Sequence, residues 1–447
     1  MRLRHMLVPL SVLALVAAAP GAANAVADPP ITSWPQFMLN SQHTGFNSTE
    51  RAINPSTVNN LGLDFVALGP ADPEFGAFRR SAPAVVNGVA YLGDAIGNLV
   101  AFPAEGCKAE TCDPLWTARL SNDVSSSPAV DNGIVFVATA GNAENGLGQL
   151  YAFLAAGCGA TVCRPLWVAQ VPNTDSSPVT ANGVVYIAAS DGTLRAFAEK
   201  GCGRPACGPL WTGPIGTSAD ASPAVDKGIV YVTSGDGLFA FRAAGCGQAR
   251  CPALWRSVPA DGIVQEVGPT VSNGHVYFAS SNFTDGGTGS VYSFAAAGCG
   301  SAVCKPEWTA HPAPEDNVAA TMAVAGGVLY ASTSGALYAF DANGCGQAEC
   351  SFLWLGFLNG FLSGTSASPT VAGGLVFFPQ DNGDIGAFAA KGCGDIVCSQ
   401  VWFTNTQPFD ALLNTPVILD GRLYVSGPRA GDRSAMYVYS LPPGGTS

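Results

Sequence analysis

Short runs of hydrophobic residues alternate with polar turn residues along most of the chain, and residues 177–212 show the pattern clearly. Asn182-Gly183 is a strong hairpin signal because both positions tolerate positive φ, and Ser190-Asp191-Gly192 marks a second turn. The runs between these turns are β-branched, aromatic or alternating, which is typical of strands. The predicted strands span residues 177–180, 184–189, 193–198 and 209–212. Four antiparallel strands in about 45 residues are the content of one propeller blade.

This unit recurs seven times, marked by the pattern F-x3-G-C-x4-C-x3-W. The seven phenylalanines are Phe102, Phe153, Phe197, Phe241, Phe294, Phe340 and Phe388. The seven tryptophans are Trp116, Trp167, Trp211, Trp255, Trp308, Trp354 and Trp402. Repetition at roughly 45 to 50 residues is typical of propeller blades, and we interpret the aromatic residues as packing between blades.

The chain predicts an eighth blade without a cysteine loop. Residues 415–440 provide three strands, and the segment at 60–68 provides the fourth, with Phe65 in the position of the tryptophan. An N-terminal strand that completes the last blade closes the ring and leaves no unpaired edge. We therefore expect an all-β, eight-bladed propeller over residues 60–440. The predicted blades are about 81–120, 126–171, 176–214, 221–258, 267–311, 320–357, 367–405, and 415–440 plus 60–68.

The N-terminus predicts export. Basic residues precede an apolar run and a small-residue cleavage site, so residues 1–25 are expected to be a signal peptide cleaved after Ala25. A lead-in at 26–59 and a tail at 441–447 flank the ring, and no later run is apolar enough to span a membrane. The net charge of −12 disfavours nucleic acid as a partner. We expect a secreted protein, most simply a monomer.

All 14 cysteines belong to the repeated motif, and we predict that they form local disulfides. The two cysteines flank a hairpin within disulfide reach, and an exported chain meets an oxidising environment. Zinc or redox chemistry is the alternative, although catalytic pairs are usually C-x2-C and the blades hold equivalent loops apart. The predicted pairs are Cys107-Cys112, Cys158-Cys163, Cys202-Cys207, Cys246-Cys251, Cys299-Cys304, Cys345-Cys350 and Cys393-Cys398.

The succession S-P-x-V, G-x-V-Y, L-x-A-F and L-W resembles the pyrroloquinoline-quinone-type (PQQ-type) propeller repeat. Residues 33–37 with 43–45 are similar to the lead-in of that family, and the resemblance extends over residues 33–440. It implies an eight-bladed ring. The family includes quinoprotein dehydrogenases, outer-membrane assembly scaffolds and secreted proteins of unknown role. Where family members commonly have a short turn between the third and fourth strands, this chain has the cysteine loop.

The resemblance to quinoprotein dehydrogenases implies a quinone and Ca²⁺ above the ring axis, a catalytic aspartate and often a disulfide between adjacent cysteines. This chain has no adjacent cysteines and little sequence beyond the ring, so no catalytic residue is transferred to it. We expect a non-catalytic binding or scaffold module for a protein, an envelope polymer or a small ligand. The alternative is a PQQ-dependent oxidoreductase. No cofactor is predicted, with Ca²⁺ or PQQ as the candidates.

Strand alternation places the first-hairpin turns and the cysteine loops on one face of the ring. The other face carries loops of variable length, where binding residues usually lie. The residue three positions before each S-P proline should approach the axis on that face, which predicts a mouth formed by Asp175, Asp220 and Glu266 with Arg80 opposite. Carboxylates suit Ca²⁺, an amine or a basic peptide. His43, His275 and His311 form no cluster, and we interpret them as surface or capping residues.

Overall fold

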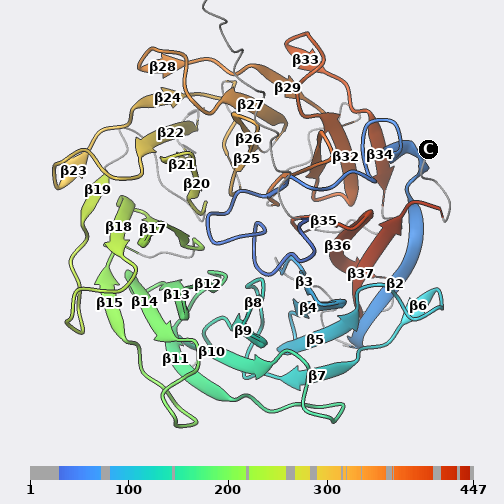
Figure 1. Ribbon diagram of the computed structural model, residues 1–447, viewed down its shortest axis with the longest axis vertical. Coiled ribbons are helices and arrows are strands. Elements are labelled where there is room, and N and C mark those ends of the chain that lie inside the picture. The colour runs from blue at the N-terminus through green and yellow to red at the C-terminus, as the bar shows by residue number, and fades with distance from the viewer. Residues whose placement is uncertain are drawn as a thin grey trace, which may run out of the picture.

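The computed structural model describes residues 30–71, 81–142, 146–217, 221–257, 267–281, 289–313, 316–318, 320–333, 335–358, 365, 367–405, 414–429 and 433–442. The strands of these residues form eight sheets arranged as a ring (Figure 1). The predicted all-β, eight-bladed propeller is confirmed.

Each of the first four blades contains four antiparallel strands that follow one another from the axis outward. Blade 1 consists of β3 (Ala84–Val86), β4 (Val89–Gly93), β5 (Asn98–Pro103) and β7 (Trp116–Arg119). Blade 2 consists of β8 (Ala129–Asp131), β9 (Ile134–Ala138), β10 (Leu147–Leu154) and β11 (Trp167–Pro172). Blade 3 consists of β12 (Val179–Ala181), β13 (Val184–Ala189), β14 (Thr193–Ala198) and β15 (Trp211–Pro214). Blade 4 consists of β16 (Ala224–Asp226), β17 (Ile229–Ser234), β18 (Gly237–Arg242) and β19 (Trp255–Ser257).

The next three blades repeat this order, and the eighth takes its outer strand from the N-terminal part of the chain. Blade 5 consists of β20 (Thr270–Ser272), β21 (His275–Ser280), β22 (Ser290–Ala295) and β24 (Trp308–Ala310). Blade 6 consists of β25 (Ala323–Ala325), β26 (Val328–Ser332), β27 (Leu337–Asp341) and β29 (Trp354–Gly356). Blade 7 consists of β30 (Thr370–Ala372), β31 (Leu375–Pro379), β32 (Asp384–Ala389) and β34 (Trp402–Asn405). Blade 8 consists of β35 (Val417–Leu419), β36 (Arg422–Arg429), β37 (Arg433–Ser440) and β2 (Gly62–Ala71).

The ring closes through β2, which pairs antiparallel with β37 and places Phe65 opposite Val438. Five short segments add to these blades. They are β1 (Phe46–Asn47), β6 (Thr111–Cys112), β23 (Val303–Cys304), β28 (Glu349–Cys350) and β33 (Val397–Cys398). The only helix within the described ranges is the 3-10 turn η1 (Val58–Asn60), so none there is long enough to cross a membrane.

The hydrophobic core lies between neighbouring blades. Trp211 of blade 3, for example, contacts Tyr186 of its own blade and Phe241 of blade 4, with ring centroids 6.2 and 6.1 Å apart. These residues belong to one buried cluster that combines both blades. Burial of each such side chain stabilises by about 2 kcal/mol. The structure thus confirms that the repeated aromatic residues pack between blades.

Candidate functional site

The lead-in segment, residues 34–47, crosses the centre of the ring and hydrogen-bonds to the innermost strand of every blade (Figure 1). Its contacts follow the order of the blades, so the segment goes around the axis once. Trp34 exchanges two backbone hydrogen bonds with Val85, and the remaining donors are Val130 to Pro35 O, Thr180 to Gln36 Oε1, Val225 to Ser41 O, Val271 to Gln42 O, Val324 to Thr44 O, Val371 to Gly45 O, and Asn47 Nδ2 to Ile418 O, at 2.6 to 3.0 Å.

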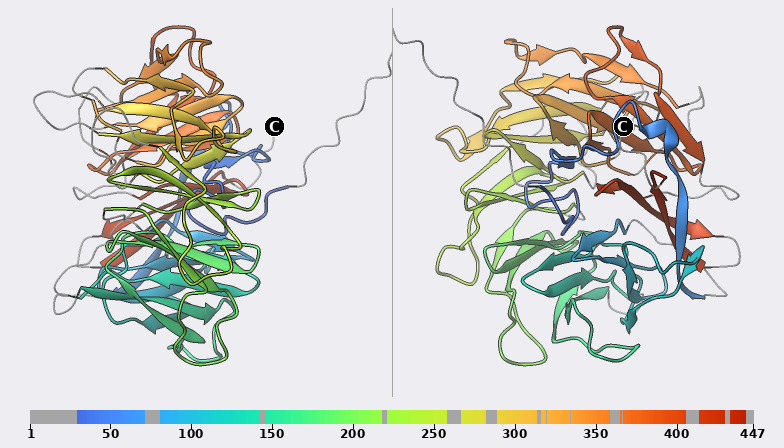
Figure 2. Two further views of the ribbon diagram at one scale, coloured as in Figure 1. Left: turned by 90° about the vertical axis from the view of Figure 1, so that its left-hand side faces the viewer. Right: turned by 45° about the vertical axis from the view of Figure 1, so that its right-hand side comes forward.

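These bonds satisfy inner-edge groups that would otherwise be unpaired, and a buried backbone N–H without a partner costs about 1–3 kcal/mol. The segment lies toward one face of the ring (Figure 2). It meets the strands next to the first-hairpin turns, so it closes the axis on that face. The sequence alone had predicted no role for the lead-in. Large apolar residues such as Trp34 and Met38, in a segment without strand or helix periodicity, are the signal for buried irregular chain.

His43 is completely buried, so its interpretation as a surface residue was wrong. Its Nδ1 lies 3.1 Å from the carbonyl oxygen of Pro269, and its Nε2 has no hydrogen-bond partner. Burial lowers the pKa of His43 to about 4, and the hydrogen bond to Pro269 opposes that shift. His275 and His311 are partly exposed.

The predicted axial mouth lies mostly outside the described residues, because Arg80, Asp220 and Glu266 are not among them. The fourth residue, Asp175, is half-buried and accepts a short hydrogen bond from the hydroxyl of Ser125. Both residues stand three positions before an S-P proline, in neighbouring blades. Their contact agrees with the expectation that this position approaches the next blade, while the acidic mouth itself stays a prediction.

The serines of the S-P pairs link neighbouring blades. The backbone N–H of Ser127 donates to Ser177 Oγ, and the N–H of Ser177 donates to Ser222 Oγ, both at 2.9 Å. Equivalent bonds join Ala82 to Ser127 and Ser368 to Thr415. These side chains are buried, so their hydroxyls are used in holding the ring together.

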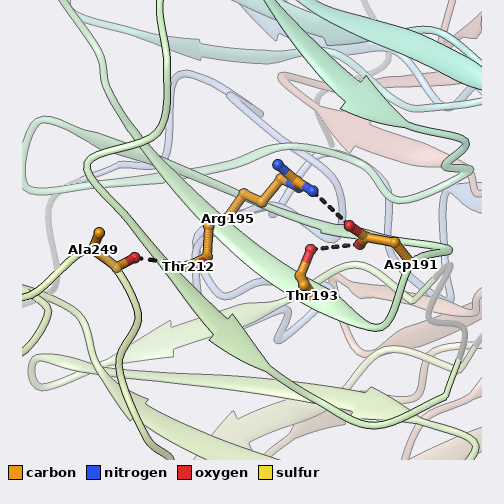
Figure 3. Close-up of polar contacts among 5 residues, drawn as sticks. All are labelled: Asp191, Thr193, Arg195, Thr212 and Ala249. Atoms are coloured by element: carbon orange, nitrogen blue, oxygen red, sulfur yellow. Dashed lines mark hydrogen bonds and ion pairs between the residues drawn. The ribbon is translucent and has the colours of Figure 1, made fainter.

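The structure contains all seven predicted disulfides and no free cysteine in the described part of the chain. Each cysteine loop also reaches the preceding blade, a contact that the sequence alone did not predict. In blade 4, for example, Thr212 of blade 3 donates its N–H to the carbonyl of Ala249 at 2.8 Å, and Cys251 donates its N–H back to Thr212 (Figure 3).

Two further contacts hold the cysteine loop of blade 4 against blade 3. Gly245 has φ +77°, and a Cβ there would lie 2.6 Å from Cδ1 of Trp211. The hydroxyl of Tyr186 donates to the carbonyl of Ala243 at 2.9 Å. The glycine–aromatic contact recurs around the ring and includes Gly106 against Phe65 of blade 8. Each cysteine loop is therefore a brace between blades as well as a closed turn.

The turn at Asp191 uses its carboxylate locally. Asp191 accepts hydrogen bonds from Thr193 Oγ1 at 2.5 Å and from Arg195 Nη2 at 2.6 Å (Figure 3). This agrees with ordinary turn chemistry. Among the described residues, no group of three His, Cys, Asp or Glu side chains could hold a metal ion.

Two cavities lie on the face closed by the lead-in. One, of about 490 Å³, lies between blades 1 and 2, where the lead-in reaches the ring, and is lined by Gln36, Tyr91 and Asp131. The other, of about 620 Å³, lies between blades 6 and 7, where the lead-in leaves the axis, and is lined by Phe46, Tyr330 and other residues. Neither cavity was predicted from the sequence.

The fold, its repeat and its lead-in define a quinoprotein-like eight-bladed propeller. The family model for outer membrane protein assembly factor BamB matches residues 205–435, which is more than half of the chain. The chain belongs to this family. No curated protein sequence matches it significantly.

Solved structures share the fold at low sequence identity. BamB from Moraxella catarrhalis is 12% identical with a TM-score of 0.58, over 85% of this chain and 99% of that one. Quinohemoprotein alcohol dehydrogenase from Comamonas testosteroni is 13% identical with a TM-score of 0.66, over 92% and 80%. The computationally designed Ika8 protein is 12% identical with a TM-score of 0.58, over 84% and 100%.

Proposed function

We propose that this chain is a secreted, disulfide-stabilised propeller that acts as a non-catalytic binding scaffold for another protein. The observation that carries the proposal is the lead-in, which hydrogen-bonds to all eight blades and closes the axis on one face. Together with the braces between blades, it makes the ring a rigid platform. The loops of the opposite face are then the natural binding region, because variable loops on a rigid scaffold usually carry recognition.

Two further observations support a protein partner. The family to which the chain belongs is described as an outer membrane assembly factor, and the fold of BamB from Moraxella catarrhalis is matched over nearly its whole length. Export through the signal peptide at 1–25 would place this chain outside the cytoplasm, as the proposal requires. N-terminal sequencing of the exported protein should begin at Val26, and a protein that keeps Met1 would contradict secretion.

The partner's contact region is proposed to include the mouth of Asp175, Asp220 and Glu266, with Arg80 opposite. Three carboxylates on successive blades suit a basic segment of a partner, an amine or Ca²⁺. The described contact from Ser125 to Asp175 supports the part of this arrangement between blades 2 and 3.

A PQQ-dependent oxidoreductase is the second candidate, favoured by the similarity to the Comamonas testosteroni dehydrogenase over 92% of this chain. Such a site needs a group of oxygen ligands for a cation beside the quinone. The described residues do not fit this group: none of them form a three-member cluster of metal-binding side chains, and Asp175 is held by Ser125. No reaction step is therefore derived through the cofactor.

One experiment separates the two candidates. The mature protein is immobilised, cross-linked to the secreted and envelope fractions of its own organism, and compared with the triple variant Asp175→Ala, Asp220→Ala and Glu266→Ala. We expect a stoichiometric partner protein that the triple variant loses. A control variant that neutralises three exposed acids of the cysteine loops (Glu110, Asp113 and Asp395) should retain it.

The same protein is then mixed with PQQ and Ca²⁺. A bound chromophore together with dye reduction would refute the non-catalytic proposal and establish the oxidoreductase. Capture of the same proteins by wild type and triple variant would refute the proposed contact region. Calorimetry with Ca²⁺ alone tests the metal form of the mouth, which an absence of heat would eliminate.

A further inference from the structure

The cavity between blades 6 and 7 exists where two turns of the repeat lack a side chain. The first-hairpin turn has a left-handed residue at the same position in every blade. Six blades have a side chain there: Asn87, Asn132, Asn182, Lys227, Asn273 and Asp420, with φ between 45° and 53°. Blades 6 and 7 instead have Gly326 and Gly373, and both of these glycines line the cavity.

The two glycines have different causes. A Cβ at Gly373 would lie 1.8 Å from the carbonyl oxygen of Ile53, so the approach of the lead-in requires glycine there. A Cβ at Gly326 would meet no atom within 4 Å. Its φ of 57° is close to the values that asparagine adopts in the other blades, so the turn itself does not require glycine. The missing side chain at Gly326 leaves open space at the cavity.

The charge of this cavity is opposite to that of the whole molecule. The chain carries a net charge of −12, yet the residues that line the cavity include Arg51 and Lys391 and no acid. Arg51 is fixed at the cavity because its Nη1 donates to the carbonyls of Ser48 and Glu50 at 2.8 and 2.7 Å. Both basic side chains are exposed, so they remain accessible to an anion.

The remaining walls are mostly apolar. Phe46, Val328, Tyr330 and Val371 supply them, and Tyr330 uses its hydroxyl to donate to Ala390 O at 2.7 Å. The cavity between blades 1 and 2 is the natural comparison: it is lined by Asp131, includes no Lys or Arg, and has Asn87 and Asn132 at its turns. A volume of about 620 Å³ is within the range of small-molecule sites.

We propose that the cavity between blades 6 and 7 binds an apolar molecule that carries one carboxylate. The apolar body lies against Phe46, Val328 and Tyr330, and the carboxylate pairs with Arg51 and Lys391. The ligand is either a free apolar acid or the C-terminal carboxylate of a peptide, which share this chemistry. The site is on the face opposite the proposed mouth, so it does not depend on the proposed protein partner.

Calorimetry of the mature protein tests the proposal with decanoate, decan-1-ol and decyltrimethylammonium. Decanoate should bind at least tenfold more tightly than the other two, because only its head group pairs with the two cations. An acetylated Ala-Phe dipeptide, as free acid and as amide, separates the sources. Tighter binding of the free dipeptide than of decanoate identifies a peptide terminus, and the reverse order identifies a free acid.

Gly326→Asn restores the side chain that other blades have and should weaken decanoate binding at least tenfold without changing the melting temperature. Lys391→Gln and Arg51→Gln should weaken binding of decanoate but not of decan-1-ol. Lys227→Gln and Asn132→Gly are the matched controls and should bind like wild type. Absence of decanoate binding, equal binding of the three probes, or wild-type affinity in both Gly326→Asn and Lys391→Gln would overturn the proposal.

Discussion

Replacing His43 with asparagine should make the propeller less sensitive to acid. His43 lies in the lead-in with φ 58°, and its Nδ1 faces the carbonyl oxygen of Pro269. Asparagine tolerates this left-handed backbone, and its amide can donate to the same carbonyl. It does not titrate between pH 4 and 7, so the substitution removes the titration while retaining the local conformation.

The magnitude follows from the pKa of His43, which burial lowers from 6.5 to about 4. Below pH 6.5 the unfolded chain binds a proton that the folded chain excludes. The free energy of unfolding therefore falls as the pH falls from 6.5 to about 4, and this contribution is constant below that range. At 1.36 kcal/mol per pKa unit, His43 should cost the wild type about 2.5 kcal/mol between pH 7 and pH 4.5.

The assay is unfolding in guanidinium chloride, followed by tryptophan fluorescence without reductant at pH 7 and pH 4.5. Carboxylate titration affects both proteins equally, so the change in the difference between wild type and His43→Asn isolates the histidine. The variant should lose about 2.5 kcal/mol less than wild type over this range. His275→Asn, at a partly exposed position, controls for histidine removal. A difference below about 0.5 kcal/mol would refute the argument that burial of His43 controls its protonation.

Three further predictions concern the contacts between blades. Gly245→Ala should destabilise by about 1–3 kcal/mol more than Gly247→Ala in thermal unfolding; both glycines have positive φ, but only the first faces Trp211, so equal costs would contradict the brace. Ser177→Ala should cost about 1–3 kcal/mol because the buried N–H of Ser127 loses its acceptor, and a stability change below about 0.5 kcal/mol would contradict that role. The double variant Cys202→Ser/Cys207→Ser should lose about 2 kcal/mol on the chain-entropy model. Mass spectrometry of the wild-type protein without reductant should find seven local disulfides, and alkylatable thiols would contradict them.

The sequence was sufficient to predict the contents of a blade because those signals are local. Asn182-Gly183 marks its hairpin, and the five-residue spacing of Cys202 and Cys207 marks a closed loop. The contact of that loop with Trp167 of the preceding blade depends on how separate blades pack, and spacing does not contain that information. Its one visible trace is the glycine before the first cysteine in all seven motifs, which the structure explains by close approach to an aromatic ring.

The site was less predictable because function is expected where the repeat is broken, and a break has no meaning until its neighbours are known. Gly326 and Gly373 visibly replace the asparagine of other blades, but their sequence positions do not show that the lead-in leaves the axis beside them. The same limit applies to Asp175: its position relative to the S-P proline predicted an approach to the next blade, and Ser125 occupies that place. In a ring of near-identical units, each departure from the repeat therefore has to be tested against the segment that crosses it, and Gly326 is the departure for which that segment supplies no structural reason.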